Sequence, residues 1–147
     1  MEKAWEFFSS PKNLAVITPN NMGFHIRTEL QEKMYPGMII VYTVKPLLNI
    51  PMTWVTEITQ VEKHAYFIDE QRVGPYAIWH HQHWFKEIDG GVEMTDIVDY
   101  RLPLAPFGNV MHFVVKSQLK KIFSYRIEKT EEIFGKKGEA KLQFINL

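Results

Sequence analysis

The chain has 147 residues, which is the usual size of one domain with one buried core. Its 17 Lys and Arg residues balance its 17 Asp and Glu residues, so no overall charge attracts nucleic acid or an anionic membrane surface. The absence of cysteine excludes disulfides and thiolate metal sites, and an aromatic content of 14% excludes a disordered chain.

The first half of the chain predicts two short helices followed by strands. Residues 2–9 have helical spacing, and residues 12–17 fit a second short helix that ends at Thr18-Pro19-Asn20. Runs rich in β-branched and aromatic residues then predict four strands, at 24–30, 38–45, 52–61 and 65–71. The short connections between these strands indicate an antiparallel meander.

A β-hairpin at residues 79–100 is the strongest local signal. Asp89-Gly90 separates two alternating runs, and this dipeptide favours a tight turn because both residues tolerate positive φ. A two-residue turn there pairs Ile88 with Gly91, whereas a turn at Gly90-Gly91 shifts the partners by two and keeps the same faces together. The first register places His83 opposite Asp96 and His81 opposite Val98. One face then combines apolar residues with two imidazoles and a carboxylate, in the set Trp79, His81, His83, Phe85, Met94, Asp96, Val98 and Tyr100. This mixture indicates a lined cavity rather than a solid core.

After Leu102-Pro103 the pattern changes to one long helix, at about residues 107–134, with a single apolar stripe. At ~1.5 Å per residue this helix is roughly 40 Å long, which is enough to cross a whole sheet. Two short helices, a strongly curved antiparallel sheet and one long helix together predict an α+β helix-grip fold, in which the sheet wraps around the helix.

Several short motifs follow one another in a specific order over residues 1–134. They are Trp5-x-x-Phe8, Ser10-Pro11-x-Asn13-Leu14, Ile17-Thr18-Pro19, Gly23-Phe24, Pro51-x-x-Trp54, Phe67-x-Asp69-x-Gln71-x-x-Gly74-Pro75-Tyr76, Trp79-x-His81-x-His83-x-Phe85, Asp89-Gly90-Gly91, Asp96, Tyr100 and Leu102-Pro103. As a set they resemble the START and birch-pollen-allergen superfamily (SRPBCC), in particular a bacterial, polyketide cyclase-like branch of ligand-binding proteins. The resemblance implies a deep, largely apolar cavity between the sheet and the long helix. It implies no single reaction, because one fold hosts many functions.

The two ends of the chain depart from that superfamily, whose members begin with an edge strand before the first short helix. Here the chain starts almost inside that helix, while residues 141–147 alternate polar and apolar residues as a strand does, after a flexible linker at 135–140. We therefore expect one domain over residues 1–147, circularly permuted naturally or by engineering. In it the displaced first strand at 141–147 lies before the first helix, with Leu147 near Met1. The alternative is an incidental tail, and a swapped homodimer stays open.

The residues expected to line the cavity come from the strands and from the start of the long helix. Aromatic rings form its walls, although ordinary core packing explains Trp54 and Trp79 equally well, and the Tyr100 hydroxyl seeks a partner there. The predicted ligand-binding set is Trp54, Trp79, His81, His83, Phe85, Asp96, Tyr100 and Met111.

Three interpretations of the polar residues in this set stay open. His83 and Asp96 are the candidates for catalysis, because a carboxylate beside an imidazole holds its tautomer and raises its pKa. His81 and His83 also have the strand spacing of two metal ligands, with Asp96 as a third. However, bulky neighbours crowd a metal and no motif of known ligand spacing is present, so we expect neither a metal nor another cofactor. Otherwise the three residues are polar anchors, for a ligand or for one another.

These observations favour a protein that binds a hydrophobic or aromatic small molecule in a deep apolar cavity. One alternative is a cyclase- or dehydratase-like enzyme that uses the His83–Asp96 pair without a cofactor. The other is a scaffold or interaction protein with a vestigial pocket, which includes an engineered permutant. Neither a signal peptide nor an apolar run long enough to cross a bilayer is present, so we expect a cytoplasmic protein without nucleic-acid binding or membrane insertion.

Overall fold

The computed structural model describes residues 1–45, 50–103 and 108–144, except for the side chains of 108–111. Near the N-terminus it has the helix α1 (Glu2–Phe8) and the 3₁₀ helices η1 (Pro11–Ala15) and η2 (Asn20–Met22). The strands are β1 (His25–Ile26), β2 (Met38–Val44), β3 (Met52–Glu62), β4 (Tyr66–Val73), β5 (Ile78–Ile88) and β6 (Gly91–Arg101). The long helix α2 (Gly108–Phe134) follows them.

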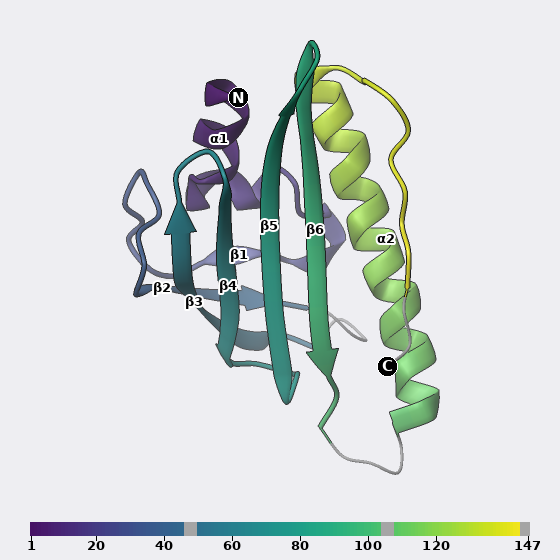
Figure 1. Ribbon diagram of the computed structural model, residues 1–147. Coiled ribbons are helices and arrows are strands. Elements are labelled where there is room, and N and C mark those ends of the chain that lie inside the picture. Colours follow the sequence, from purple (N-terminus) through teal and green to yellow (C-terminus); the bar gives the residue numbers. More distant parts are fainter. Residues whose placement is uncertain (46–49, 104–107, 145–147) are drawn as a thin grey trace.

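The six strands form one antiparallel sheet in chain order, from β1 to β6. Figure 1 shows that the sheet is curved, with β2 and β3 running across the direction of β5 and β6, while α2 lies beside β6. Two register shifts in the β3–β4 pairing, after Val55 and after Ile58, contribute to this curvature because an extra residue bends a strand. The architecture is therefore α+β and consistent with a helix-grip arrangement.

Two predicted elements differ from the observed ones. The sequence predicts a helix at 12–17, and the structure has the tighter 3₁₀ turn η1 at this place, with Asn13 and Val16 bonded three residues back. The strand predicted at 24–30 is reduced to His25–Ile26. The ladder ends there because the N–H of Val41 donates to the hydroxyl of Thr28, at 3.1 Å, instead of to a backbone carbonyl.

The predicted hairpin register is confirmed. Ile88 pairs with Gly91, His83 lies opposite Asp96, and His81 lies opposite Val98. Gly90 has a φ of 66°, as a tight turn after Asp89 requires. The alternative register, shifted by two residues, is thereby excluded.

The strand predicted at 141–147 is not found over residues 141–144. Gly135 follows α2 with a φ of 84°, and from there the chain turns back along the helix (Figure 1). Phe144 consequently packs on α2, where the Nζ of Lys116 lies 5.2 Å from its ring centroid. Residues 145–147 lie outside the described residues, so the proximity of Leu147 to Met1 stays a prediction.

Two buried apolar clusters cover one face of the sheet. The first consists of Met38, Ile40, Tyr42, Val44, Trp54 and Ile58, from β2 and β3. The second joins Trp5, Phe8 and Ile17 to Phe67 and Phe85 of β4 and β5. Trp5 contacts Phe85 edge-on, with 5.5 Å between ring centroids, and so fastens α1 to the sheet.

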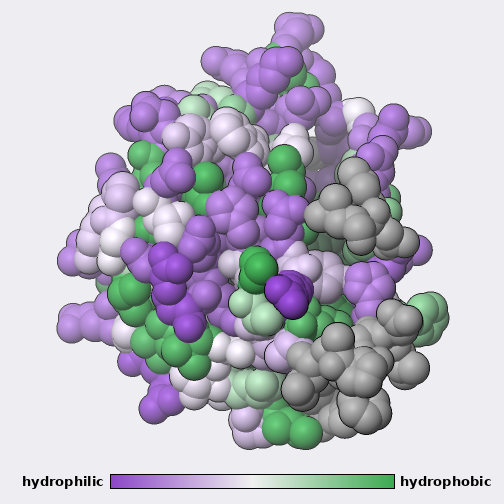
Figure 2. Space-filling model, turned by 60° about the horizontal axis from the view of Figure 1, so that its bottom comes forward, coloured by the Kyte–Doolittle hydropathy of each residue, from purple (hydrophilic) through white to green (hydrophobic). Residues whose placement is uncertain are grey.

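The exterior is mixed in polarity. On the face shown in Figure 2, hydrophobic side chains occur in small groups between hydrophilic ones. On the outer face of the sheet Trp84 is 40% exposed and packs against Tyr66, with 4.6 Å between ring centroids. Within the described part of the chain, no helix combines the length and the apolar character needed to cross a membrane.

Ile58 and Ile39 provide a test of this core, because Ile58 is 2% exposed and Ile39 on the neighbouring strand is 46% exposed. Ile58→Ala should lower the free energy of unfolding by about 2–5 kcal/mol, since it removes buried methyl groups and leaves a void. Ile39→Ala should change it by no more than about 0.5 kcal/mol. Urea denaturation measures both values, and equal losses in the two variants would contradict the described sheet faces.

Candidate functional site

A cavity of about 150 Å³ lies between the sheet, α2 and the N-terminal helices. Most of its wall is apolar and comes from the two clusters described above, together with Val115, Leu119 and Phe123 of α2. Its charged or imidazole-bearing wall residues are Asp69, His81, His83 and Arg126. Hydrogen bonds and ion pairs connect these four with one another and with Asp96, so the charged part of the wall lies at one place. Uncharged polar residues also line the cavity, namely Ser10, Asn13, Thr18, Thr56 and Gln118.

Of the eight residues predicted to line one cavity, seven divide between two hollows. Trp54, Trp79, His81 and His83 line the cavity just described. Phe85, Asp96 and Tyr100 instead line a groove of about 1520 Å³ between β6, α2 and the segment 135–144. Phe85 does not reach the cavity because α1 packs Trp5 and Phe8 against it. Met111 belongs to α2, and its side chain lies outside the described residues.

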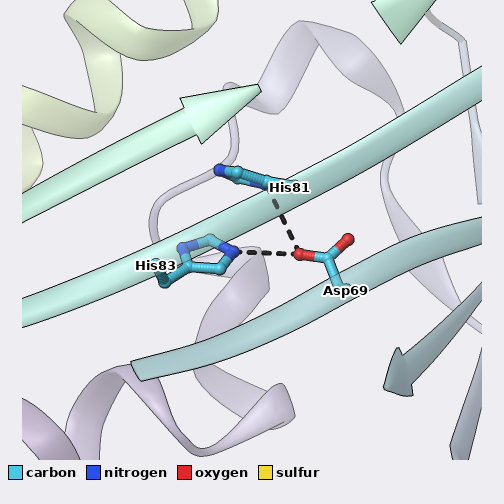
Figure 3. Close-up of side chains that lie close together, drawn as sticks. All are labelled: Asp69, His81 and His83. Carbon is cyan, nitrogen blue, oxygen red and sulfur yellow. Dashed lines mark hydrogen bonds and ion pairs between the residues drawn. The ribbon is translucent and has the colours of Figure 1, made fainter. Parts of the chain in front are cut away.

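Strand pairing assembles the polar cluster on one sheet face. Asp69 of β4 is the cross-strand partner of His81 on β5, and Asp96 of β6 is the partner of His83. Because side chains alternate along a strand, His81 and His83 project to the same side. Figure 3 shows both imidazoles converging on the Asp69 carboxylate. Arg126 approaches Asp96 from α2, with Nη1 3.4 Å from Oδ1.

Both histidines contact both carboxylates. Nε2 of His81 lies 3.0 Å from Oδ1 of Asp96, and Nε2 of His83 lies 2.9 Å from Oδ2 of Asp69, each in hydrogen-bond geometry. The second nitrogens make ion-pair contacts outside hydrogen-bond geometry. Nδ1 of His83 is 2.7 Å from Oδ1 of Asp96, and Nδ1 of His81 is 3.4 Å from Oδ2 of Asp69. The imidazoles are buried, and the two carboxylates remain 15% and 17% exposed.

The distances assign the protons in this cluster. An ionised carboxylate only accepts, so each ring nitrogen that hydrogen-bonds to one carries a hydrogen, which places a proton on Nε2 of both imidazoles. We assign His83 a second proton on Nδ1 and a positive charge because its ring lies between two carboxylates, whereas His81 has a proton on Nε2 alone. The charges of His83 and Arg126 cancel those of Asp69 and Asp96, which makes the buried cluster neutral.

The pKa shifts agree with this assignment. Burial acts to lower the pKa of His83, but the charge of Asp96 and the hydrogen bond to Asp69 outweigh it and raise the pKa. Burial and the neighbouring His83 charge lower the pKa of His81. For Asp96, burial acts to raise the pKa, and the charges of His83 and Arg126 hold it well below the ordinary value. The pKa of Asp69 is also lowered, because His81 and His83 together outweigh its burial.

Asp69 and Arg126 are the members of the site that sequence reasoning did not assign to it. Asp69 is part of the Phe67-x-Asp69-x-Gln71 motif, but its role depends on the β4–β5 register, for which the sequence has no tight-hairpin signal. Arg126 lies 30 positions from Asp96 in the sequence, on α2. Its side chain is only 11% exposed. The sequence did contain a signal for its burial, because Arg126 falls within the apolar stripe of the long helix.

No model of a known protein family matches the chain, and no curated protein matches it either. Solved structures do resemble it. The crystal structure of protein Ms6760 from Mycobacterium smegmatis gives a TM-score of 0.63 at 18% identity, over 89% of this chain and 81% of that one. The crystal structure of TTHA0849 from Thermus thermophilus gives a TM-score of 0.60 at 12% identity, over 82% of each chain. At these identities the likeness establishes a shared fold.

The charge assignment predicts that Asp96→Asn lowers the pKa of His83, because the variant removes the carboxylate charge that favours the imidazolium. An NMR titration of the imidazole nitrogens measures this pKa. Asp99→Asn is the matched control, since Asp99 lies three residues further along β6 on the exposed face, opposite His80. A His83 titration that is the same in both variants and in the unaltered protein would refute the assignment.

Proposed function

We propose that the protein binds a small aromatic molecule with a polar substituent in the cavity beneath α2. The observation that carries this proposal is the cavity wall, which is mostly apolar and aromatic and has its charged groups in one cluster. Pockets of this kind hold a ligand by apolar contact and orient it with a few polar groups. The resemblance of residues 1–134 to a ligand-binding branch of the SRPBCC superfamily supports the same proposal.

The size of the cavity limits the ligand. An engineered protein cavity of about 150 Å³ binds benzene, so the 150 Å³ here suits a ligand of about one aromatic ring. A multi-ring ligand requires α2 or the N-terminal helices to move outward. The proposal therefore concerns a monocyclic compound rather than a large polycyclic one.

The polar groups of the wall indicate which substituent fits. Nε1 of Trp54 is a buried donor without a hydrogen-bond partner among the described residues. Nδ1 of His81 carries no hydrogen in the proton assignment above, and it accepts none of the hydrogen bonds found in the described structure. Nδ1 of His83 and Nε of Arg126, in the same wall, are likewise buried without a hydrogen-bond partner among the described residues. A hydroxyl group both donates and accepts, so a phenol suits a wall that offers unpaired donors together with an acceptor.

Phenol itself provides the first test. Saturable binding should shift the indole N–H resonances of Trp54 and Trp79 in NMR spectra of the full chain. Val115→Phe should abolish the shifts, because Val115 is buried in the wall and a phenyl ring fills the space. Val114→Phe is the matched control, because the neighbouring Val114 is 41% exposed.

Phenol shifts that persist unchanged in Val115→Phe would place the binding elsewhere, and shifts that never saturate would refute the proposal. Native mass spectrometry after gentle purification tests for a ligand retained from the cell, and its mass identifies the compound.

A second candidate function is catalysis by the same cluster, in a cyclisation or dehydration reaction. It is favoured by the position of His83, whose imidazole lies in the cavity wall and contacts both carboxylates. A protonated imidazole beside a bound molecule serves as a general acid that gives its proton to the substrate. The paired carboxylate serves as the base that removes another proton from the substrate and passes it to the imidazole, which restores the starting state.

Activity screening with polyketide-like and small hydroxy-aromatic substrates tests this candidate. If turnover occurs, His83→Gln should reduce kcat by roughly 10²–10⁴-fold while phenol still binds. An active His83→Gln variant would exclude His83 as the acid, and phenol binding without turnover of any substrate would leave the binding proposal alone.

A further inference from the structure

We propose that Asp69, His81 and His83 form a binding site for one divalent transition-metal ion, with Zn²⁺ as the best match. The proposal goes beyond the binding of an aromatic molecule and does not depend on it. It reverses the expectation from the sequence, which considered Asp96 as the third ligand. The structure brings Asp69 to the histidines from β4, so the carboxylate and imidazoles converge from two strands.

The three ligand atoms have the spacing of a metal site. Oδ2 of Asp69 lies 2.9 Å from Nε2 of His83 and 3.4 Å from Nδ1 of His81, and all three atoms lie within 4.8 Å of one another. In tetrahedral coordination, bonds of about 2.0–2.2 Å to Zn²⁺ place the ligand atoms roughly 3.4 Å apart. The distance between Asp69 and His81 already has this value, whereas the distance of 2.9 Å between Asp69 and His83 has to lengthen when the metal ion replaces the proton between them.

The other ring nitrogens are already held as they are in many metal sites. A metal-bound histidine usually donates its second N–H to a carboxylate, which fixes the ring and its tautomer. Here Asp96 accepts a hydrogen bond from Nε2 of His81 at 3.0 Å, and it makes an ion-pair contact of 2.7 Å with Nδ1 of His83. Arg126 in turn holds Asp96, with Nη1 at 3.4 Å. Asp96 is therefore a supporting partner and not a ligand.

The net charge of the cluster also favours a cation between Asp69 and the two imidazoles. With both imidazoles neutral, the two carboxylates and Arg126 carry one net negative charge in a largely buried cluster. In the metal-free protein, the proton between His83 and Asp69 supplies the compensating charge. A metal ion bound to the same two atoms replaces that proton.

The ligand set and the surroundings favour zinc over other divalent cations. Two imidazoles and one carboxylate suit Zn²⁺, whereas Mg²⁺ and Ca²⁺ prefer sites made of oxygen atoms. All three residues lie in the cavity wall, so a fourth coordination position faces the cavity. Three protein ligands with an open position are typical of a zinc site that binds water or a substrate atom.

Metal titrations of the full chain, purified without a tag and treated with EDTA, test the proposal. Calorimetry should show one Zn²⁺ bound per chain and no binding of Mg²⁺. Co²⁺ bound at the same site should give the visible absorption that is typical of tetrahedral Co²⁺. In NMR spectra of the unaltered protein, Zn²⁺ should shift the resonances of Nδ1 of His81 and Nε2 of His83 most strongly. No stoichiometric Zn²⁺ binding, or shifts confined to other histidines, would overturn the proposal.

Variants separate this site from surface binding. Asp69→Asn and His83→Gln should each weaken Zn²⁺ binding by at least roughly 10–100-fold, the loss seen when even a supporting residue is removed. His80→Gln is the matched control, because His80 pairs with Glu70 on the other face of the same two strands, with Nδ1 3.0 Å from Oε1. Equal Zn²⁺ affinity in the inner variants and the control would refute the site.

Two further results distinguish the proposed metal site from the proposed binding of phenol. Val115→Phe should bind Zn²⁺ normally while it loses phenol, because Val115 lines the cavity and is not among the ligands. If an inner variant does not fold, which circular dichroism detects, the NMR shifts of the unaltered protein decide the question.

Discussion

The pairing of two carboxylates with two imidazoles and one guanidinium is the interaction on which the structure depends most. Its members come from three neighbouring strands and from α2, and they meet where apolar side chains surround them. Removal of one member of a buried ion pair leaves an uncompensated charge, which costs about 3–5 kcal/mol. The strand registers and the position of α2 that bring these groups together are therefore favoured over arrangements that separate them.

The cluster can stay buried because its charges sum to zero. Any group that replaces the proton between His83 and Asp69 therefore has to compensate for the charge that is lost. The positive charge of His83 faces Asp69 at 2.9 Å, in the wall of the cavity. Under the proposals made above, a proton, a metal ion and the polar substituent of a bound molecule compete for that small volume. The proposed binding of an organic molecule, proton transfer and metal binding are then alternatives at one place, and occupancy by one would change the affinity for the others.

Much of the fold could be predicted from the sequence, because local signals specify it. Asp89-Gly90 defined the hairpin turn, and the period of two along both strands then placed His83 opposite Asp96. The chain end shows the limit of the same reasoning. Alternation over 141–147 suggested a strand, but pairing also needs a neighbouring edge, and Gly135 directs the chain along α2 instead.

The complete site could not be predicted, because two of its residues arrive through long-range packing. The β4–β5 connection contains Gly74-Pro75 and no hairpin signal, so the pairing of Asp69 with His81 has no local cause. The position of the Arg126 side chain depends on how α2 is rotated about its axis over the sheet. The apolar stripe determines this rotation only approximately. These two residues nevertheless complete the charged cluster. Asp69 adds a second carboxylate to the His–Asp pair, and the charge of Arg126 adds to that of His83 in keeping Asp96 ionised beside both imidazoles.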